Sequence, residues 1–268
     1  MKVSAVSWTD YSSGDLNFVS GCTPVSESCQ NCYARAIYER FGRDFSKVVV
    51  DSAKLWRAFS SKAYGDFSPK RGPGYKPMCF LCDTGDIAHE AVPDSFLLDA
   101  WRLMAARKDV IWQVLTKRPH RLLDFLSNYG YQYQIGGEPN IHIGVTAENR
   151  ARANERIPIL LEIPAAVRFV SAEPMLGPVD LRQYLPMRHA DGTLYFSYRY
   201  GHKHGLSWVI AGAESGPNRR PFDVAWAEAL YQQCKEAGTP YFGKQDSGLY
   251  PGVPLILSDG IVHQWPEA

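Results

Sequence analysis

The stretch Val110-Ile111-Trp112-Gln113-Val114-Leu115, followed at once by the polar Thr116-Lys117-Arg118, sets the pattern of this chain. A short apolar run rich in β-branched residues and bounded by polar or turn residues is typical of a buried strand. The pattern recurs after residue 77 in the runs 78–82, 141–145, 167–170, 208–212 and, more weakly, 240–243. With a first strand expected near residues 16–20, the sequence predicts about seven strands.

Helical patterns separate these runs. Pro93-Asp94 opens a segment with apolar residues at helical spacing, and residues 222–237 form another such segment that stops at Gly238. Strands that alternate with helices indicate βαβ units and a parallel sheet with right-handed crossovers. The sequence therefore predicts an α/β fold, a full or partial β/α (TIM-like) barrel with parallel strands.

Length and composition favour a globular chain. With 268 residues, 45% of them hydrophobic, the chain can bury a core, which excludes disorder as its main state. The formal net charge of +1 argues against a protein that binds nucleic acid by bulk charge alone, although a local basic groove is compatible with it. We expect one domain over residues 1–268, with surface insertions at about 42–76 and 182–205.

The chain shows no sign of export or membrane insertion. No stretch approaches the roughly 18 to 20 apolar residues of a membrane helix, and residues 1–10 lack the apolar run of a secretory signal. We therefore expect a cytoplasmic protein. In a reducing cytosol, its six cysteines are expected to be metal ligands or buried thiols rather than disulfides.

Three cysteines form the sharpest motif. Cys22, Cys29 and Cys32 are spaced C-x6-C-x2-C directly after the first expected strand. Thiolates are soft ligands, and a close trio on a loop can hold three corners of a metal centre. A [4Fe-4S] cluster held by three cysteines leaves one iron free to bind another group.

Two other interpretations of the trio remain open at this level. The thiols could be buried and structural, or they could bind zinc with a fourth ligand from the 79–82 segment or from a histidine. Cys79 and Cys82 are a poor chelating pair, because positions i and i+3 of a strand face opposite sides. We expect these two cysteines, and Cys234 on its helix, to be core thiols.

Polar residues follow the apolar runs at their carboxyl ends, where the active site of a parallel β/α scaffold lies. Solvated loop residues would also be polar, so position alone does not assign a role. His89 and Glu90 precede a helix start, where packing or capping is at least as good an explanation as catalysis. The residues at the strand ends are Asp83, Thr84, Asp86, Thr116, Lys117, Arg118, Thr146, Glu148, Asn149, Arg150, Ser171, Glu173, Glu214, Ser215, Lys244 and Gln245.

The order of these motifs resembles the three-Cys-motif family common in phage genomes, whose members look like radical S-adenosylmethionine enzymes of the spore-photolyase kind. Two features depart from the pattern: the first cysteine gap is six residues rather than three, and Asn17-Phe18 stands where family members tend to carry Asn-Pro. The matching stretches are 8–10, 21–34, 82–93, 115–119, 144–149, 168–174, 212–216 and 243–245.

The resemblance implies a cofactor set and residues to bind it. Cys22, Cys29 and Cys32 would hold a [4Fe-4S] cluster, and S-adenosylmethionine bound to the free iron would be cleaved to a 5′-deoxyadenosyl radical that abstracts hydrogen. The candidate cofactor-binding residues are Asp83, Thr84 and Asp86 for the ammonium, Lys117 or Arg150 for the carboxylate, Thr146, Glu148 and Asn149 for the ribose, and Tyr33 for the adenine or as a cap on the cluster.

The resemblance also implies a substrate class. We expect modification or rearrangement of a nucleic-acid base or nucleotide by an isomerase, lyase or related enzyme in the host cytoplasm, with a reducing donor such as flavodoxin or ferredoxin. Two alternatives are a radical enzyme acting on a peptide, amino acid or metabolite, and a non-enzymatic zinc-stapled binding module. The candidate catalytic residues are Glu173, Glu214 and Lys244, and the candidate substrate-binding residues are Arg219, Arg220 and Gln245.

Overall fold

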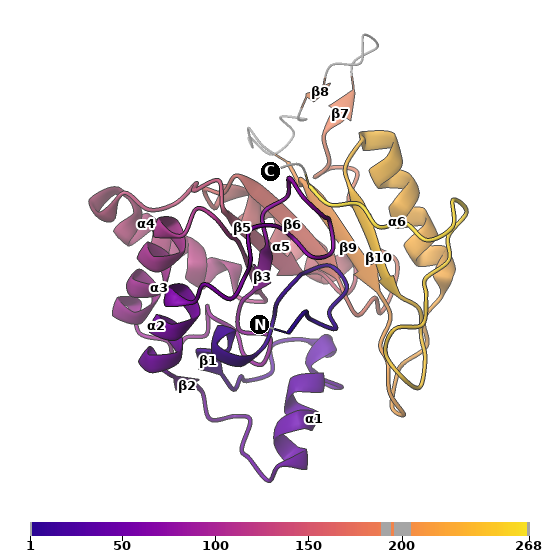
Figure 1. The fold of residues 1–268 in the computed structure, drawn as a ribbon. Coiled ribbons are helices and arrows are strands. Elements are labelled where there is room, and N and C mark those ends of the chain that lie inside the picture. The colour runs from indigo at the N-terminus through magenta and orange to yellow at the C-terminus, as the bar shows by residue number, and fades with distance from the viewer. Residues whose placement is uncertain (1, 189–193, 196–204, 267–268) are drawn as a thin grey trace. The chain divides into compact units, whose positions relative to one another are not determined.

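A six-stranded parallel sheet organises the chain (Figure 1), with the strand order β10-β9-β6-β5-β4-β3. The computed structural model describes residues 2–188, 194–195 and 205–266. Each strand pairs with its predecessor in the sheet, and β3 and β10 are the edges, so the fold is the open, partial form of the predicted β/α barrel. The strands are β3 (Met78–Phe80), β4 (Ile111–Thr116), β5 (Ile141–Thr146), β6 (Val167–Ala172), β9 (Trp208–Gly212) and β10 (Tyr241–Gln245).

The chain divides into two compact units, which are described separately below. Unit 1 comprises residues 1–143 and 163–166, and unit 2 comprises residues 144–162 and 167–268. In the described ranges, no helix combines the length and the apolar composition needed to cross a membrane. The helices are α1 (Tyr33–Arg40), α2 (Ser52–Ser60), α3 (Asp94–Ala106), α4 (Pro119–Tyr133), α5 (Arg150–Glu162) and α6 (Val224–Ala237).

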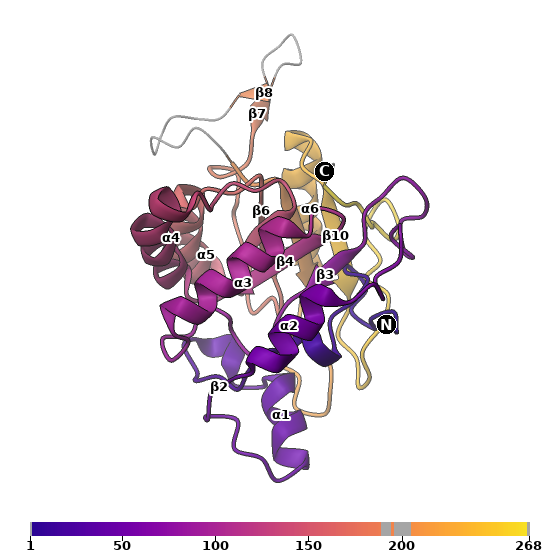
Figure 2. The ribbon, with the colours of Figure 1, turned by 60° about the vertical axis from the view of Figure 1, so that its left-hand side comes forward.

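In unit 1, helices α2 and α3 run side by side near β3 and β4 (Figure 2). The ring of Trp112 on β4 lies 4.5 Å from the ring of Phe59 on α2, measured between centroids, and 5.7 Å from that of Tyr64. Asp51 caps α2, because its Oδ1 accepts the N–H of Lys54 at 2.9 Å. The segment 42–76, predicted as a surface insertion, therefore contributes a capped helix and buried aromatic residues to the core of this unit.

In unit 2, helix α6 packs against β9 and β10 (Figure 1). Asp223 caps its first turn, and Gly238 ends it in the left-handed conformation with φ of 69°. Leu230 and Cys234 face the interior and are fully buried. The helix predicted over 222–237 is thus confirmed, with its first turn shifted by two residues.

The first expected strand lies outside the parallel sheet. Residues Val19–Ser20 form β1, which pairs antiparallel with β2 (Val49–Val50) in a sheet of its own. Gly14 and Gly21 both have positive φ, which interrupts the extended backbone on either side of β1. The parallel sheet therefore has six strands rather than about seven.

The second expected insertion, 182–205, is described only in part, because residues 189–193 and 196–204 lie outside the described residues. Within it, β7 (Met187–Arg188) pairs antiparallel with β8 (Leu194–Tyr195).

Candidate functional site

The loop that carries the three cysteines is fixed at its start. The N–H of Gly21 donates to the carbonyl of Thr84 at 3.0 Å, and the N–H of Cys22 donates to the carbonyl of Phe45 at 2.8 Å. Gly21 has φ of +80°, and a Cβ there would lie 2.3 Å from the carbonyl oxygen of Lys47. Only glycine fits this position, which delivers the first cysteine to the end of β3.

The six cysteines fall into two groups. Cys22, Cys29 and Cys32 are partly exposed, and all six cysteines are free thiols. The remaining three are buried, which confirms the prediction that they are core thiols; they are Cys79, Cys82 and Cys234. Burial raises the pKa of each of these three thiols, so they stay protonated and unreactive.

Two thiols of the loop have shifted pKa values. Burial opposes ionisation of Cys29, but backbone hydrogen bonds from Val25 and Ser26 and the charge of Lys117 outweigh it and lower the pKa. Burial and the carboxylate of Asp86 raise the pKa of Cys22, against the opposing effect of Arg118. The loop is therefore a set of accessible thiols in an environment that supplies both hydrogen bonds and positive charge.

Arg118 fastens the cysteine loop to the strand ends. Its side chain is only 1% exposed, and its Nη1 donates to the Sγ of Cys22 at 3.5 Å and to Asp86 Oδ2 at 3.2 Å. Its Nη2 donates to both the carbonyl and the hydroxyl oxygen of Thr23 at 3.0 Å, and its Nε donates to Glu90 at 2.8 Å. The sequence placed Arg118 at a strand end but assigned it no role, because these partners are distant in the chain.

His89 supports the same loop from the other side. Its Nδ1 accepts the N–H of Ala91 at 3.0 Å, so its Nε2 carries the proton and donates to the Thr23 hydroxyl at 2.9 Å. Burial and the nearby Arg118 charge lower the pKa of His89. The neutral ring thus caps a turn and holds Thr23, in agreement with a capping role.

The structure brings Tyr33, Asp83 and Thr84 together in unit 1. The Tyr33 hydroxyl donates to the carbonyl of Asp83, and Asn17 donates to Asp83 Oδ1 at 2.6 Å. The same Asn17 accepts the N–H of Thr84 at 3.2 Å. Burial raises the pKa of Asp83, with hydrogen bonds from Asn17 and Ser12 opposing the shift.

Asp86 and Lys117 differ in how many partners their charged groups have within the protein. The buried carboxylate of Asp86 accepts hydrogen bonds from Ala88 N–H, the Thr116 hydroxyl, Lys117 N–H and Arg118. By contrast, the half-buried Lys117 ammonium forms no ion pair with any described residue, although its charge acts on Cys29. Lys117 is therefore a half-buried cation near Cys29 that is available to an incoming anion.

The donor set suits a cluster of several irons. Within the described residues, no three side chains of His, Cys, Asp or Glu converge on a point that a single ion could occupy. A [4Fe-4S] cluster does not need such convergence, because each thiolate binds a different iron. Three accessible thiols on one loop, beside a lysine and a buried arginine, fit that group.

Two ion pairs lie at the strand ends of unit 2. Lys244 at the end of β10 pairs with Glu173, which follows β6; their side chains are 21% and 16% exposed. Glu214, which follows β9, pairs with Arg220 and accepts its backbone N–H at 2.8 Å. Three of the predicted catalytic residues and one substrate residue thus form two part-buried ion pairs.

The residues after β5 have mostly internal contacts. Glu148 is fully buried and pairs with Arg156 at 3.0 Å, and Arg156 also donates to the buried Thr146 carbonyl at 2.8 Å. Asn149 accepts the N–H of Arg152 at 3.0 Å, which places it as a cap on α5. The next residue, Arg150, is 70% exposed and lies 3.7 Å from Asp180.

The remaining predicted substrate residues also contact the backbone. The exposed Arg219 donates to the Gly216 carbonyl at 3.1 Å. Gln245 is buried, donates to the Ala213 carbonyl at 2.9 Å and accepts the Gly252 N–H at 3.1 Å. Its amide therefore links two backbone segments of unit 2.

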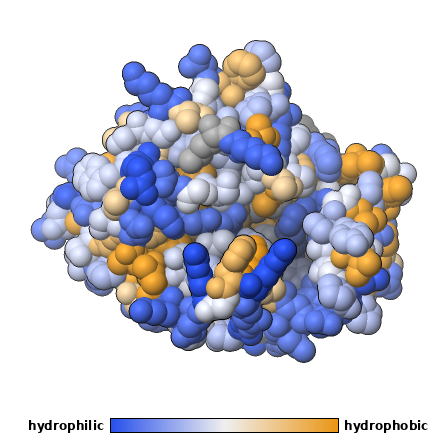
Figure 3. Space-filling model, turned by 60° about the horizontal axis from the view of Figure 1, so that its bottom comes forward, coloured by the Kyte–Doolittle hydropathy of each residue, from blue (hydrophilic) through white to orange (hydrophobic). Residues whose placement is uncertain are grey.

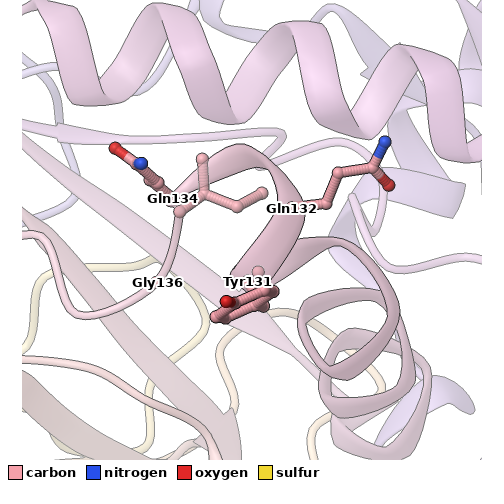
Figure 4. Close-up of a pocket in the computed structure, with 6 residues that line it drawn as sticks. Tyr131, Gln132, Gln134 and Gly136 are labelled. Atoms are coloured by element: carbon pink, nitrogen blue, oxygen red, sulfur yellow. The ribbon is translucent and has the colours of Figure 1, made fainter.

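A surface pocket at the end of α4 does not involve any of these residues. It has a volume of about 640 Å³ and is lined by residues 130–132 and 134–136. Figure 4 shows the side chains of Tyr131, Gln132 and Gln134 pointing away from one another rather than into a common centre. This pocket offers no converging polar groups.

The fold and the site define an α/β protein of the partial β/α-barrel type with a three-cysteine loop at the end of its first parallel strand. The chain belongs to the family described as "Protein of unknown function (DUF5131)", whose model matches residues 3–252. No curated protein sequence matches this chain significantly.

Three solved structures of spore photoproduct lyase are similar to this chain. The complex with dinucleoside spore photoproduct is 14% identical with a TM-score of 0.44, and the match covers 88% of this chain and 63% of that chain. A point mutant is 12% identical with a TM-score of 0.49, covering 93% and 78% of the two chains. A double mutant with bound AdoMet and dinucleoside spore photoproduct is 12% identical with a TM-score of 0.41, covering 82% and 60%. In two of these three structures, the match thus spans less than two thirds of the length of the lyase chain.

Proposed function

We propose that this protein is a radical S-adenosylmethionine enzyme whose [4Fe-4S] cluster is held by Cys22, Cys29 and Cys32. When bound, the two cofactors supply one-electron cleavage of the sulfonium C–S bond to methionine and a 5′-deoxyadenosyl radical, which takes a hydrogen atom from the substrate. The protein itself positions the reactants and excludes competing reactions.

One observation carries the proposal: the split between the two groups of cysteines. Three thiols are accessible on one short loop, and the other three are buried with raised pKa values. Gly21 and Arg118 fix the loop through backbone geometry and a buried guanidinium. A loop built only to pack in the core would not keep its thiols accessible beside unpaired positive charge.

Unit 1 offers groups for each end of the methionine moiety. We assign Lys117 to the carboxylate, since it is half-buried and has no ion-pair partner among the described residues. Oxygen atoms of Asp83 and Thr84 would accept the ammonium, and Tyr33 would cover the cluster. Because Asp86 already accepts four hydrogen bonds, we assign it to holding Arg118 rather than to the ammonium.

Unit 2 offers the candidate substrate residues. Glu173 and Lys244 form a part-buried ion pair, whose carboxylate and ammonium would contact polar groups of the substrate. Glu214 and Arg220 form a second pair, next to the exposed Arg219, which could bind a phosphate. We propose a nucleic-acid base or nucleotide as the substrate, with an isomerase- or lyase-type reaction.

The remaining predicted ribose and carboxylate residues keep lesser roles in the proposal. Thr146, at the end of β5, and Asn149, which caps α5, would hold the backbone near the cofactor in place. Glu148 is committed to Arg156. Arg150 is exposed enough to meet an anionic group from solvent.

The test is anaerobic reconstitution followed by a cleavage assay. We expect about four irons and matching sulfide per chain, with 5′-deoxyadenosine released from S-adenosylmethionine after reduction. Cys29→Ala should lose both iron and cleavage, whereas Cys234→Ala, in a buried core thiol, should keep both. Zinc in place of iron, with no cleavage, would overturn the proposal in favour of a metal-stapled scaffold.

The substrate is tested by the same release measured with added single-stranded DNA, nucleotides or peptides. We expect stimulation and a modified product only with the nucleic-acid components. Stimulation by peptides or free amino acids alone would overturn the proposed substrate class and leave the radical chemistry in place.

A further inference from the structure

An exposed apolar stripe lies on the helix that follows the cysteine loop. Tyr33, Ile37 and Phe41 are 55%, 44% and 68% exposed. They are spaced by four residues, so they lie on one face of α1 and its C-terminal end. We call these three residues the α1 stripe.

The stripe is not the packing face of α1. The adjoining face of the helix carries the buried Ala34 and also Tyr38, whose ring lies 5.1 Å from that of Phe45 in edge-on contact. In Figure 1, α1 lies away from α2 and α3 of the same unit. The apolar side chains of the stripe therefore remain exposed although the helix already has a core contact.

Basic residues outnumber acidic ones on α1 and in the loop after it, and we call Arg40 and Arg43, which flank Phe41 in the chain, the basic rim of the stripe. Arg35, Arg40, Arg43 and Lys47 lie on α1 or in the loop after it, against the acidic Glu39 and Asp44. No described residue forms an ion pair with any of the four basic side chains, and Asp44 instead accepts hydrogen bonds from Ser46. Figure 3 shows hydrophobic side chains between strongly hydrophilic ones on the forward face, where α1 of Figure 1 comes to the front.

The stripe is close to the cluster ligands along the chain. Cys32 is the N-cap of α1. At a rise of 1.5 Å per residue, Ile37 lies about 8 Å and Phe41 about 14 Å from Cys32 along the helix axis. A redox protein seated here would bring its own centre within a short distance of the iron ligands.

We infer that the α1 stripe and its basic rim are the docking surface for an acidic protein that donates single electrons at low potential. This inference rests on the proposed function, which consumes one electron for each cleavage. A donor with a reduced flavin would pass one electron to the oxidised cluster, release a proton and become the semiquinone. An acidic donor complements the rim, and electron-transfer encounters need only small interfaces, below about 1,200 Å².

Nucleic acid fits the stripe less well. Platforms for single strands use aromatic rings on which the bases stack, whereas the centre of this stripe is the aliphatic Ile37. An apolar centre with a charged rim is the usual anatomy of a protein interface. The surface is thus better matched to a protein than to a phosphodiester backbone.

The test compares two reductants on the cluster-loaded protein. Flavodoxin hydroquinone must dock, whereas photoreduced 5-deazariboflavin is small and neutral and needs no docking surface. The variants are Arg40→Glu/Arg43→Glu and Ile37→Ser/Phe41→Ser. The matched controls are Lys108→Glu and Tyr131→Ser, exposed residues that lie elsewhere in unit 1.

Stopped-flow bleaching of the cluster absorbance gives the rate of reduction. We expect the charge reversal to lower the rate with flavodoxin by about tenfold or more and to remove its dependence on salt. The serine pair should also lower this rate, while both controls and all rates with deazariboflavin stay at the wild-type level.

Three results would overturn the inference. One is a flavodoxin rate that both variants leave unchanged. Another is loss of single-stranded DNA binding, measured by fluorescence anisotropy, with unchanged flavodoxin rates, which would assign the surface to nucleic acid. The third is a wild-type protein without any reducible cluster, which would refute the proposed function itself and is recognised by its failure with deazariboflavin.

Discussion

Replacing Arg118 should destabilise unit 1 more than any surface change, because the guanidinium is buried and has charged partners. Its side chain is 1% exposed, and Asp86 beside it is 7% exposed. Arg118→Met leaves the Asp86 carboxylate buried without its cation and removes the donors to Thr23 and Cys22. Breaking one side of a buried ion pair costs about 3–5 kcal/mol.

Urea unfolding of the iron-free protein measures this loss. Arg118→Lys keeps the charge without the planar fork, so it should lose less than Arg118→Met. The matched control is Arg182→Met, which removes an ion pair with Asp180 whose arginine is 71% exposed, and it should cost less than about 1 kcal/mol. In the double variant Asp86→Asn/Arg118→Met, the second change should cost less than it does alone.

The reasoning fails if Arg118→Met costs under about 1 kcal/mol, or if the two changes simply add. Either result would mean that the guanidinium makes no net contribution to holding the cysteine loop against the strand ends. A second readout is iron content after reconstitution, which should fall in Arg118→Met and stay unchanged in Arg182→Met.

Three further predictions concern other parts of the chain. Burial, with the charge of Arg71, lowers the pKa of His142 from 6.5 to about 3. Between these pH values the unfolded chain binds a proton that the folded chain does not, so the free energy of unfolding should fall as the pH drops below 6.5. In urea unfolding at about pH 4.5, the wild type should lose about 3 kcal/mol of stability that His142→Gln does not lose. Gly21→Ala should bind less iron and should lower the free energy of unfolding by at least about 1–2 kcal/mol, because the backbone there is left-handed. The loss should exceed that of the control Gly216→Ala, since Gly216 also has positive φ but has nothing within 4 Å of its Cβ position. Lys244→Met should abolish product formation, while chromatography should still detect 5′-deoxyadenosine released without product. Loss of both would instead assign this residue to cofactor binding.

The parallel strands were predictable because each is a buried apolar run that ends in polar residues, and β4 and β5 agree within a residue or two with the sequence pattern. Helix α2 was missed because Leu55 and Phe59 lie in a stretch rich in Ser, Lys, Gly and Pro, where composition favours a loop. The position of β1 was missed because a two-residue strand between glycines of positive φ has no periodicity to read.

The cysteines of the site were predictable from their spacing, but the residue that anchors them was not. Arg118 lies 96 positions from Cys22 and 28 from Glu90, and no local pattern links residues so far apart. Asp86 illustrates the converse: its place at a strand end suggested a cofactor ligand, whereas the fold surrounds its carboxylate with backbone and side-chain donors. Strand-end position identifies where polar groups gather, and only tertiary contacts show which of them are already occupied.

The separation between Cys22 and Arg118 also sets an order of assembly. During synthesis the three thiols emerge from the ribosome well before β4, and the guanidinium that will fasten their loop is made 96 residues later than Cys22. In that interval the nascent thiols face metal ions and oxidants with no preformed geometry to select among them. For the proposed [4Fe-4S] cluster, delivery of iron and sulfide is therefore expected after β3 and β4 have paired, because a chain interrupted earlier carries the three cysteines without Arg118.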